Sequence, residues 1–224
     1  MKTIDYILAS FSDVRLRAFD IPKLRGYFSN KYPEDSLLHN HLGGGKFSYR
    51  APQIQYRIHK GSPALLGFAD GIELIKKIVL DNHNITIGDK SMQVNEIQVD
   101  FFREEFGQSE DYFNYEFASP WMALNQENYR AYVKMNTMDQ KRRLRQILKG
   151  NLLTLSKAFD YTIPDFDLIE TDGWFKQVSR NFHNIPMHCF TGEFSMNFRI
   201  PEFLALGKQV ARGFGVVKTY KEER

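Results

Sequence analysis

The chain has 224 residues, a formal net charge of +3 and 42% apolar residues. This length fits one large domain or two small ones, and the composition is that of a globular protein. A single cysteine excludes an internal disulfide, and no apolar run is long enough to span a membrane, so we expect a cytoplasmic protein with no membrane partner.

The first half of the chain predicts the order strand, helix, strand, strand, helix, strand. Alternating apolar residues indicate the strands, Asp20 with Pro22 marks the first helix start, and Asp70 with Glu73 predicts a capping box for the second. The predicted elements are a strand at 3–11, a helix from about 20 to 33, strands at 53–58 and 62–66, a helix from 70 and a strand near 97–101.

The second half follows an acidic junction near residues 104–110 and again predicts strands and helices in alternation. The predicted elements are a strand at 112–117, helices at 123–134 and 138–158, a loop and strand over 160–171, a strand at 194–200, a short helix at 201–210 and a strand at 216–220. We therefore predict an α+β fold of two tandem ferredoxin-like (RRM-like) βαββαβ domains with antiparallel sheets, at residues 1–107 and 108–224.

Two histidines lie one residue apart in the stretch that follows the first predicted helix. His39 and His41 precede three consecutive glycines, and the stretch continues through Lys46, Tyr49 and Arg50. Imidazoles titrate near neutrality, so one can act as a base while its neighbour acts as an acid. In an extended loop both would face one target, and the glycines would let backbone N–H groups approach a phosphate.

Other interpretations of this stretch stay open. The two histidines could be solvated surface groups, and the glycines could form an ordinary flexible hairpin. A His-x-His pair also resembles part of a metal site, but a structural site needs about four ligands and the remaining histidines are scattered. We therefore predict neither a metal nor a cofactor.

Charge is unevenly distributed along the chain. Residues 36–69 and 203–221 contain no acidic side chain, whereas acidic residues cluster at 100–116 and 160–172. Such segregation favours a basic face that binds a polyanion. The bases of the predicted helix at 138–158 are more typical of a solvated face than of a binding site.

Two groups of residues resemble the CRISPR-associated endoribonucleases of the RAMP superfamily, which process precursor crRNA. The first group is Leu24-Arg25-Gly26-Tyr27, Asn30-Lys31, Leu37-Leu38-His39-Asn40-His41, Tyr49-Arg50-Ala51-Pro52-Gln53-Ile54-Gln55-Tyr56 and Leu66-Gly67-Phe68-Ala69-Asp70-Gly71. The second is Leu206-Gly207 with Arg212-Gly213-Phe214-Gly215-Val216, similar to the glycine-rich loop of that superfamily. The resemblance covers nearly the full chain.

The resemblance implies metal-independent cleavage of CRISPR repeat RNA, by attack of a ribose 2′-OH on the adjacent phosphate. The products would carry a 2′,3′-cyclic phosphate and a 5′-OH. His39 and His41 match the paired histidines of one branch of the family, Lys31 its lysine and Tyr49 its tyrosine. His41 is our choice for the more essential histidine, and which of the two acts as the base stays open.

The implied partner is CRISPR repeat RNA. We assign RNA contact to Lys46, Arg50, Arg142, Arg143, Arg145, Lys208, Arg212 and Lys218 and to the loop glycines Gly213 and Gly215. Other subunits of a CRISPR effector complex and a second copy of this chain are further partners that the sequence leaves open. The alternative functions are an RNA-binding subunit of a CRISPR complex without catalysis, and a His-x-His metalloenzyme.

Overall fold

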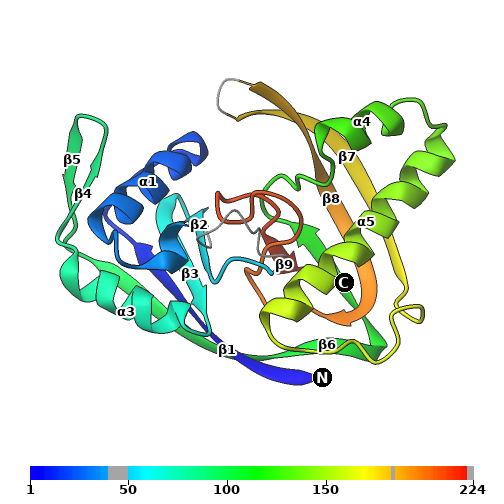
Figure 1. Ribbon diagram of the computed structural model, residues 1–224, viewed down its shortest axis with the longest axis horizontal. Coiled ribbons are helices and arrows are strands. Elements are labelled where there is room, and N and C mark those ends of the chain that lie inside the picture. The colour runs from blue at the N-terminus through cyan, green and yellow to red at the C-terminus, as the bar shows by residue number, and fades with distance from the viewer. Residues whose placement is uncertain (40–49, 183–184, 221–224) are drawn as a thin grey trace. The chain divides into compact units, whose positions relative to one another are not determined.

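The computed structural model describes residues 1–39, 50–182 and 185–220 (Figure 1). The chain divides into two compact units. The N-terminal unit comprises Ile4–Glu104 and Ala211–Gly213, and the C-terminal unit comprises Met1–Thr3, Glu105–Val210 and Phe214–Arg224. The division at residues 107 and 108 stays a prediction.

The N-terminal unit contains a sheet with the strand order β2-β3-β1-β6. Its strands are β1 (Lys2–Phe11), β2 (Ile54–His59), β3 (Ser62–Phe68) and the first part of β6 (Ile97–Phe117). The ladders of β3 with β1 and with β2 are antiparallel, with Leu8 opposite Leu66 and Tyr56 opposite Leu65. Numbered within the unit, the order is 2-3-1-4, as expected for the ferredoxin-like arrangement.

Helices α1 (Ile21–Lys31) and α3 (Gly71–Asp81) pack on this sheet (Figure 1). The buried side of α1 consists of Ile21, Leu24 and Phe28, which recur at helical spacing. The predicted capping box of α3 is wrong, since the Asp70 side chain makes no cap hydrogen bond. The helix instead follows Ala69, whose positive φ of 51° turns the chain, and the Ala69 carbonyl accepts from the N–H of Ile72 at 3.1 Å.

Three features of this half differ from the prediction. A hairpin of β4 (Asn84–Ile87) and β5 (Lys90–Gln93) follows α3, with Gly88 at a positive φ of 59° in its turn. The two strands predicted near 97–101 and 112–117 are parts of one strand, β6, which continues through the acidic residues between them. The third is a short helix, α2 (Ser36–His39), where an extended loop was predicted.

The C-terminal unit uses the remainder of β6 as its first strand. It adds α4 (Gln126–Tyr132), α5 (Thr137–Ala158), β7 (Thr171–Phe182), β8 (Ile185–Arg199) and β9 (Val217–Thr219). The antiparallel ladders give the order β7-β8-β6-β9, again 2-3-1-4 within the unit. The predicted α5 is confirmed, and its buried stripe includes Leu144, Leu148 and Leu152.

The helix predicted at residues 201–210 is wrong. The segment forms turns, with positive φ values of 66° at Phe203 and 57° at Gln209 that a helix does not allow. Its backbone pairs with the returning chain instead, since the N–H of Val217 donates to the Leu204 carbonyl at 2.8 Å. The first helix of this unit is also shorter than predicted, because Asn125 caps α4 by accepting from the N–H of Asn128 at 2.7 Å.

The strand orders and antiparallel ladders of the two units confirm the predicted α+β class with tandem ferredoxin-like folds. The second unit departs from the ideal only where turns replace a regular helix before β9. No helix in the described part of the chain is long and apolar enough to cross a membrane.

Candidate active site

Helix α2 fixes where the histidine stretch begins. Leu38 is 1% exposed and belongs to the core of the N-terminal unit, and its carbonyl accepts a hydrogen bond from the Ser29 hydroxyl of α1 at 2.9 Å. His39 is the next residue and the last of α2. The backbone of His39 is therefore anchored directly to α1 rather than lying in an extended loop, and its side chain lies outside the described part.

The turn that leads into α2 is tied to α3. Lys77 of α3 forms ion pairs with Glu34 at 3.1 Å and with Asp35 at 3.0 Å. The hydrogen bonds to Asp35 and then to Glu34 raise the pKa of Lys77, whereas a backbone hydrogen bond at Glu34 itself, followed by the contact with Lys77, lowers the pKa of Glu34. Lys77 of α3 thus holds in place the acidic turn that leads into α2.

Buried Asn82, at the end of α3, holds the end of α1 in place. Its Nδ2 donates to the Tyr32 hydroxyl at 2.7 Å and to the Ile78 carbonyl at 2.6 Å, and its Oδ1 accepts from Lys31 Nζ at 2.5 Å. Lys31 also donates to the Tyr27 hydroxyl at 3.4 Å. The predicted catalytic lysine therefore points at the end of α3 in this structure.

Helix geometry separates Lys31 from the α2 side of α1. Successive residues of an α-helix are about 100° apart, so positions 29 and 31 point to nearly opposite sides. Ser29 faces α2, whereas Lys31 faces Asn82. Arg25 is four residues before Ser29 and shares its side of the helix. Arg25 is therefore the cation of α1 that faces the start of the histidine stretch.

Arg212 lies near the C-terminal end of the sequence, yet it interacts electrostatically with Arg25 of α1. Residues 211–213 belong to the N-terminal unit, where Arg212 forms a parallel bridge with Tyr56 of β2. Burial, and then the nearby charge of Arg25, lowers the pKa of Arg212. Burial also raises the pKa of Tyr56, and Arg25 opposes that rise. The fold thus brings two arginines together that are 187 positions apart in the chain, a concentration of positive charge suited to a phosphate.

The conformation of the backbone explains why glycine occupies positions 213 and 215 of the loop. Gly213 has a φ of +84°, and a Cβ there would lie 3.2 Å from the Tyr56 carbonyl oxygen. Gly215 has a φ of +71°, and a Cβ would overlap the Leu206 carbonyl oxygen. Both positions therefore require glycine for the turn itself, whatever their part in RNA contact.

The remaining predicted contact residues lie on the C-terminal unit. Lys208 is exposed, Lys218 is paired with Glu116, Arg142 with Asp139 and Arg145 with Asp172, while Arg143 is half-buried beside α4. Two of the three arginines of α5 are thus already neutralised by acids, so the basic stripe is weaker than its sequence indicates.

His41, Lys46 and Tyr49 lie outside the described residues. Arg50 is exposed, and it is where the description of the chain resumes after the histidine stretch. The sequence interpretation did not include Arg25 among the candidate site residues. Its four-residue spacing from Ser29 was the available signal, but that spacing has meaning only once α2 is known to pack there.

Both halves of the chain match family profiles. Residues 2–105 match the Cas6b N-terminal domain, and residues 107–220 match the Cas6b C-terminal domain. The chain belongs to the Cas6b family. The resemblance of the sequence to CRISPR-associated processing proteins is thereby confirmed at the level of the family.

Solved structures and a curated relative agree with this assignment to Cas6b. A crystal structure of Cas6b is 34% identical, with a TM-score of 0.91, and the match covers 98% of this chain and 100% of that one. A crystal structure of the CRISPR RNA processing endoribonuclease Cas6b is 31% identical, with a TM-score of 0.80 and the same coverage. The uncharacterized protein MJ0978 of Methanocaldococcus jannaschii is 38% identical over 122 residues, which are 53% of this chain and 80% of that protein.

Proposed function

We propose that this chain is an endoribonuclease that cuts CRISPR repeat RNA, converting pre-crRNA to crRNA without a metal ion. Full-length membership of the Cas6b family carries the proposal, together with a solved relative described as a CRISPR RNA processing endoribonuclease that is 31% identical. The imidazole pair at positions 39 and 41 supplies groups that can move protons near neutral pH.

The proposed reaction is an intramolecular transesterification. One histidine removes the proton of a ribose 2′-OH, the oxygen attacks the adjacent phosphorus, and the other histidine protonates the departing 5′-oxygen. The products are a 2′,3′-cyclic phosphate and a 5′-OH. His39, His41, Lys31 and Tyr49 are the proposed catalytic residues, and Lys31 would have to leave Asn82 to reach the reacting phosphate.

Positive charge must offset the charge that develops on the phosphorane. Arg25 and Arg212 are the described cations that we propose for this role, because Arg25 shares the side of α1 that faces α2 and the charge of Arg25 acts on Arg212. We propose the exposed Arg50 and Lys208 as further contacts to the RNA backbone, together with the loop of Gly213 and Gly215.

Cleavage in a chelator tests the reaction. We expect purified protein to cut repeat RNA once, at the same rate in EDTA as in Mg²⁺. A single 2′-deoxy substitution at the scissile nucleotide should abolish cutting while binding remains, because the nucleophile is then missing. Mapping of the product ends checks for the cyclic phosphate. Loss of cleavage in EDTA, or cleavage of the deoxy substrate, would contradict the proposal.

Arg25→Ala tests the placement of the cations. We expect RNA binding to weaken by about 10- to 150-fold, since a charge-assisted hydrogen bond contributes about 1.5–3 kcal/mol. The slope of log affinity against log salt should fall by about one. Lys23→Ala is the matched control, because Lys23 lies on the same helix and pairs with Asp20 at 3.5 Å.

Equal losses of RNA affinity in Arg25→Ala and Lys23→Ala would show that α1 acts only through its general positive charge.

Lys31→Ala separates a structural role of Lys31 from a catalytic one. Removing the contact to Asn82 should lower thermal stability in either case, whereas a fall in kcat with unchanged RNA affinity would support catalysis by Lys31.

A further inference from the structure

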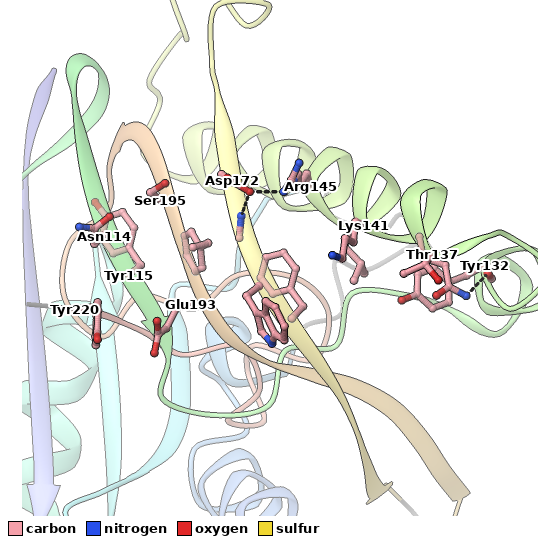
Figure 2. Close-up of a pocket in the computed structure, with 16 residues that line it drawn as sticks. Asn114, Tyr115, Tyr132, Thr137, Lys141, Arg145, Asp172, Glu193, Ser195 and Tyr220 are labelled. Carbon is pink, nitrogen blue, oxygen red and sulfur yellow. Dashed lines mark hydrogen bonds and ion pairs between the residues drawn. The ribbon is translucent and has the colours of Figure 1, made fainter. Parts of the chain in front are cut away.

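A pocket of about 560 Å³ lies in the C-terminal unit, whereas the histidine stretch falls within the sequence range of the N-terminal unit. The lining of the pocket comes mainly from α5 and from the strands β6, β8 and β7, with Tyr132 of α4 and Tyr220 completing it. Figure 2 shows Lys141 and Arg145 on α5, Asp172 on β7, and Glu193 and Ser195 on β8. The volume is in the range of small-ligand sites.

Trp174 is the unusual member of this lining. Its side chain is 76% exposed, whereas Trp121, the other tryptophan of the chain, is fully buried. Lys141 Nζ lies 5.7 Å from the centroid of the Trp174 ring. Such a cation–π contact at an exposed site contributes about 0.5–1 kcal/mol and leaves most of the indole in water. The intramolecular contacts therefore do not account for a large aromatic side chain on this surface.

The strand register places a carboxylate beside the indole. Trp174 of β7 is directly opposite Glu193 of β8, and Asp172 is directly opposite Ser195. Directly opposed residues share a face of the sheet and have Cβ atoms about 5 Å apart. The pocket thus combines an exposed flat ring, a carboxylate next to it and a lysine over it, while the ion pair of Asp172 holds Arg145 at the rim.

This set of groups matches the parts of a nucleotide. Unpaired RNA bases stack on aromatic side chains and form hydrogen bonds through their Watson–Crick edges. A carboxylate offers two acceptor oxygens and no donor, and guanine is the base with two adjacent donors, N1–H and N2–H, on that edge. Lys141 supplies the charge that a neighbouring phosphate needs.

We propose that this pocket binds one unpaired nucleotide of the RNA, with its base stacked on Trp174 and its edge held by Glu193, with a preference for guanine. The proposal rests on the proposed function for the identity of the ligand as RNA. It adds a binding position on the C-terminal unit that recognises a base rather than the backbone.

Tryptophan fluorescence gives a direct measurement. Single-stranded pentanucleotides with 2′-O-methyl riboses cannot be cut by 2′-OH attack, so they report binding alone. We expect a uridine pentamer with a central guanosine to quench the exposed Trp174 and the all-uridine pentamer to quench it more weakly. In Trp174→Phe the remaining signal comes from buried Trp121 and should not change.

Affinity measurements with labelled oligonucleotides complete the test. Trp174→Ala should weaken binding of the guanosine oligonucleotide by about 5- to 150-fold, the range found for base–aromatic stacking. Glu193→Gln should remove the preference for guanosine over uridine. Tyr112→Ala is the matched control, because Tyr112 is also an exposed aromatic of this unit but bonds to Glu170 and does not line the pocket.

The outcomes separate this proposal from the proposed function. Cleavage of repeat RNA by Trp174→Ala at wild-type affinity, with no fluorescence change in the native protein, would overturn the pocket proposal alone. Quenching by the guanosine oligonucleotide without any cleavage of repeat RNA would support the pocket and contradict the endoribonuclease proposal. Binding of free guanosine monophosphate as tightly as the oligonucleotide would overturn the assignment to RNA.

Discussion

Replacing His41 by alanine is expected to slow RNA cleavage by about 10²–10⁴-fold, the usual contribution of a positioned acid or base. RNA affinity should change much less than the rate, because one imidazole is a small part of the contact with the phosphate backbone. Single-turnover rates and equilibrium binding, measured on the same repeat RNA, separate the two effects. The wild-type rate should follow a bell-shaped pH profile near neutrality, since one histidine must be neutral and the other protonated.

His83→Ala is the matched control for that variant. His83 is an exposed histidine between α3 and β4, and its replacement removes an imidazole without touching the proposed chemistry. An unchanged cleavage rate in His41→Ala would contradict catalysis by the histidine pair. It would favour the alternative in which the chain holds RNA without turnover.

Gly215→Ala is expected to destabilise the protein by about 2–5 kcal/mol. A left-handed backbone costs an L-residue about 1–2 kcal/mol, and the overlap of the new Cβ with the Leu206 carbonyl adds about 1–3 kcal/mol. The overlap cannot be relieved cheaply, because Gly215 N–H donates to the Pro120 carbonyl at 2.9 Å and Leu206 N–H donates to Gly215 at 2.9 Å. The melting temperature should fall by roughly 4–20 °C.

Gly150→Ala provides a control of opposite sign. Gly150 is inside α5, and a Cβ there would meet nothing within 4 Å. Alanine is favoured over glycine in a helix, so this change should stabilise the protein by up to about 1 kcal/mol. If Gly215→Ala kept full thermal stability but lost RNA affinity, the glycine would serve the RNA rather than the turn.

The parts of the fold that sequence predicts well are those set by local periodicity. Helix α5 carries its apolar residues at helical spacing, and β1 begins the chain with an apolar run. The errors come from long-range pairing. Residues 201–210 have acceptable helix composition, yet Leu204 and Leu206 bond to the returning chain at Val217 and Gly215, and that pairing decides their backbone.

The same distinction applies to the candidate site. The histidine pair, the glycine-rich loop and the cations are visible in the sequence because their residue types are unusual together. The sequence does not show which of the basic side chains come together in the folded chain. Arg25 and Arg212 become neighbours only through the bridge of Arg212 to Tyr56, and Lys31 lies on the side of α1 away from α2, where Asn82 accepts its hydrogen bond. Trp174 carries no motif, and its exposure on a sheet face can be known only from the structure.

Because residues 211–213 return to the N-terminal unit, we expect that the two family domains do not fold independently when they are expressed as separate fragments. A fragment ending at residue 105 would stop within β6 and would lack residues 211–213, whose backbone pairs with β2 at Tyr56. The edge strand β2 would then be exposed and prone to self-association. Such a fragment should stay soluble only when a synthetic peptide spanning the glycine-rich loop is supplied in trans.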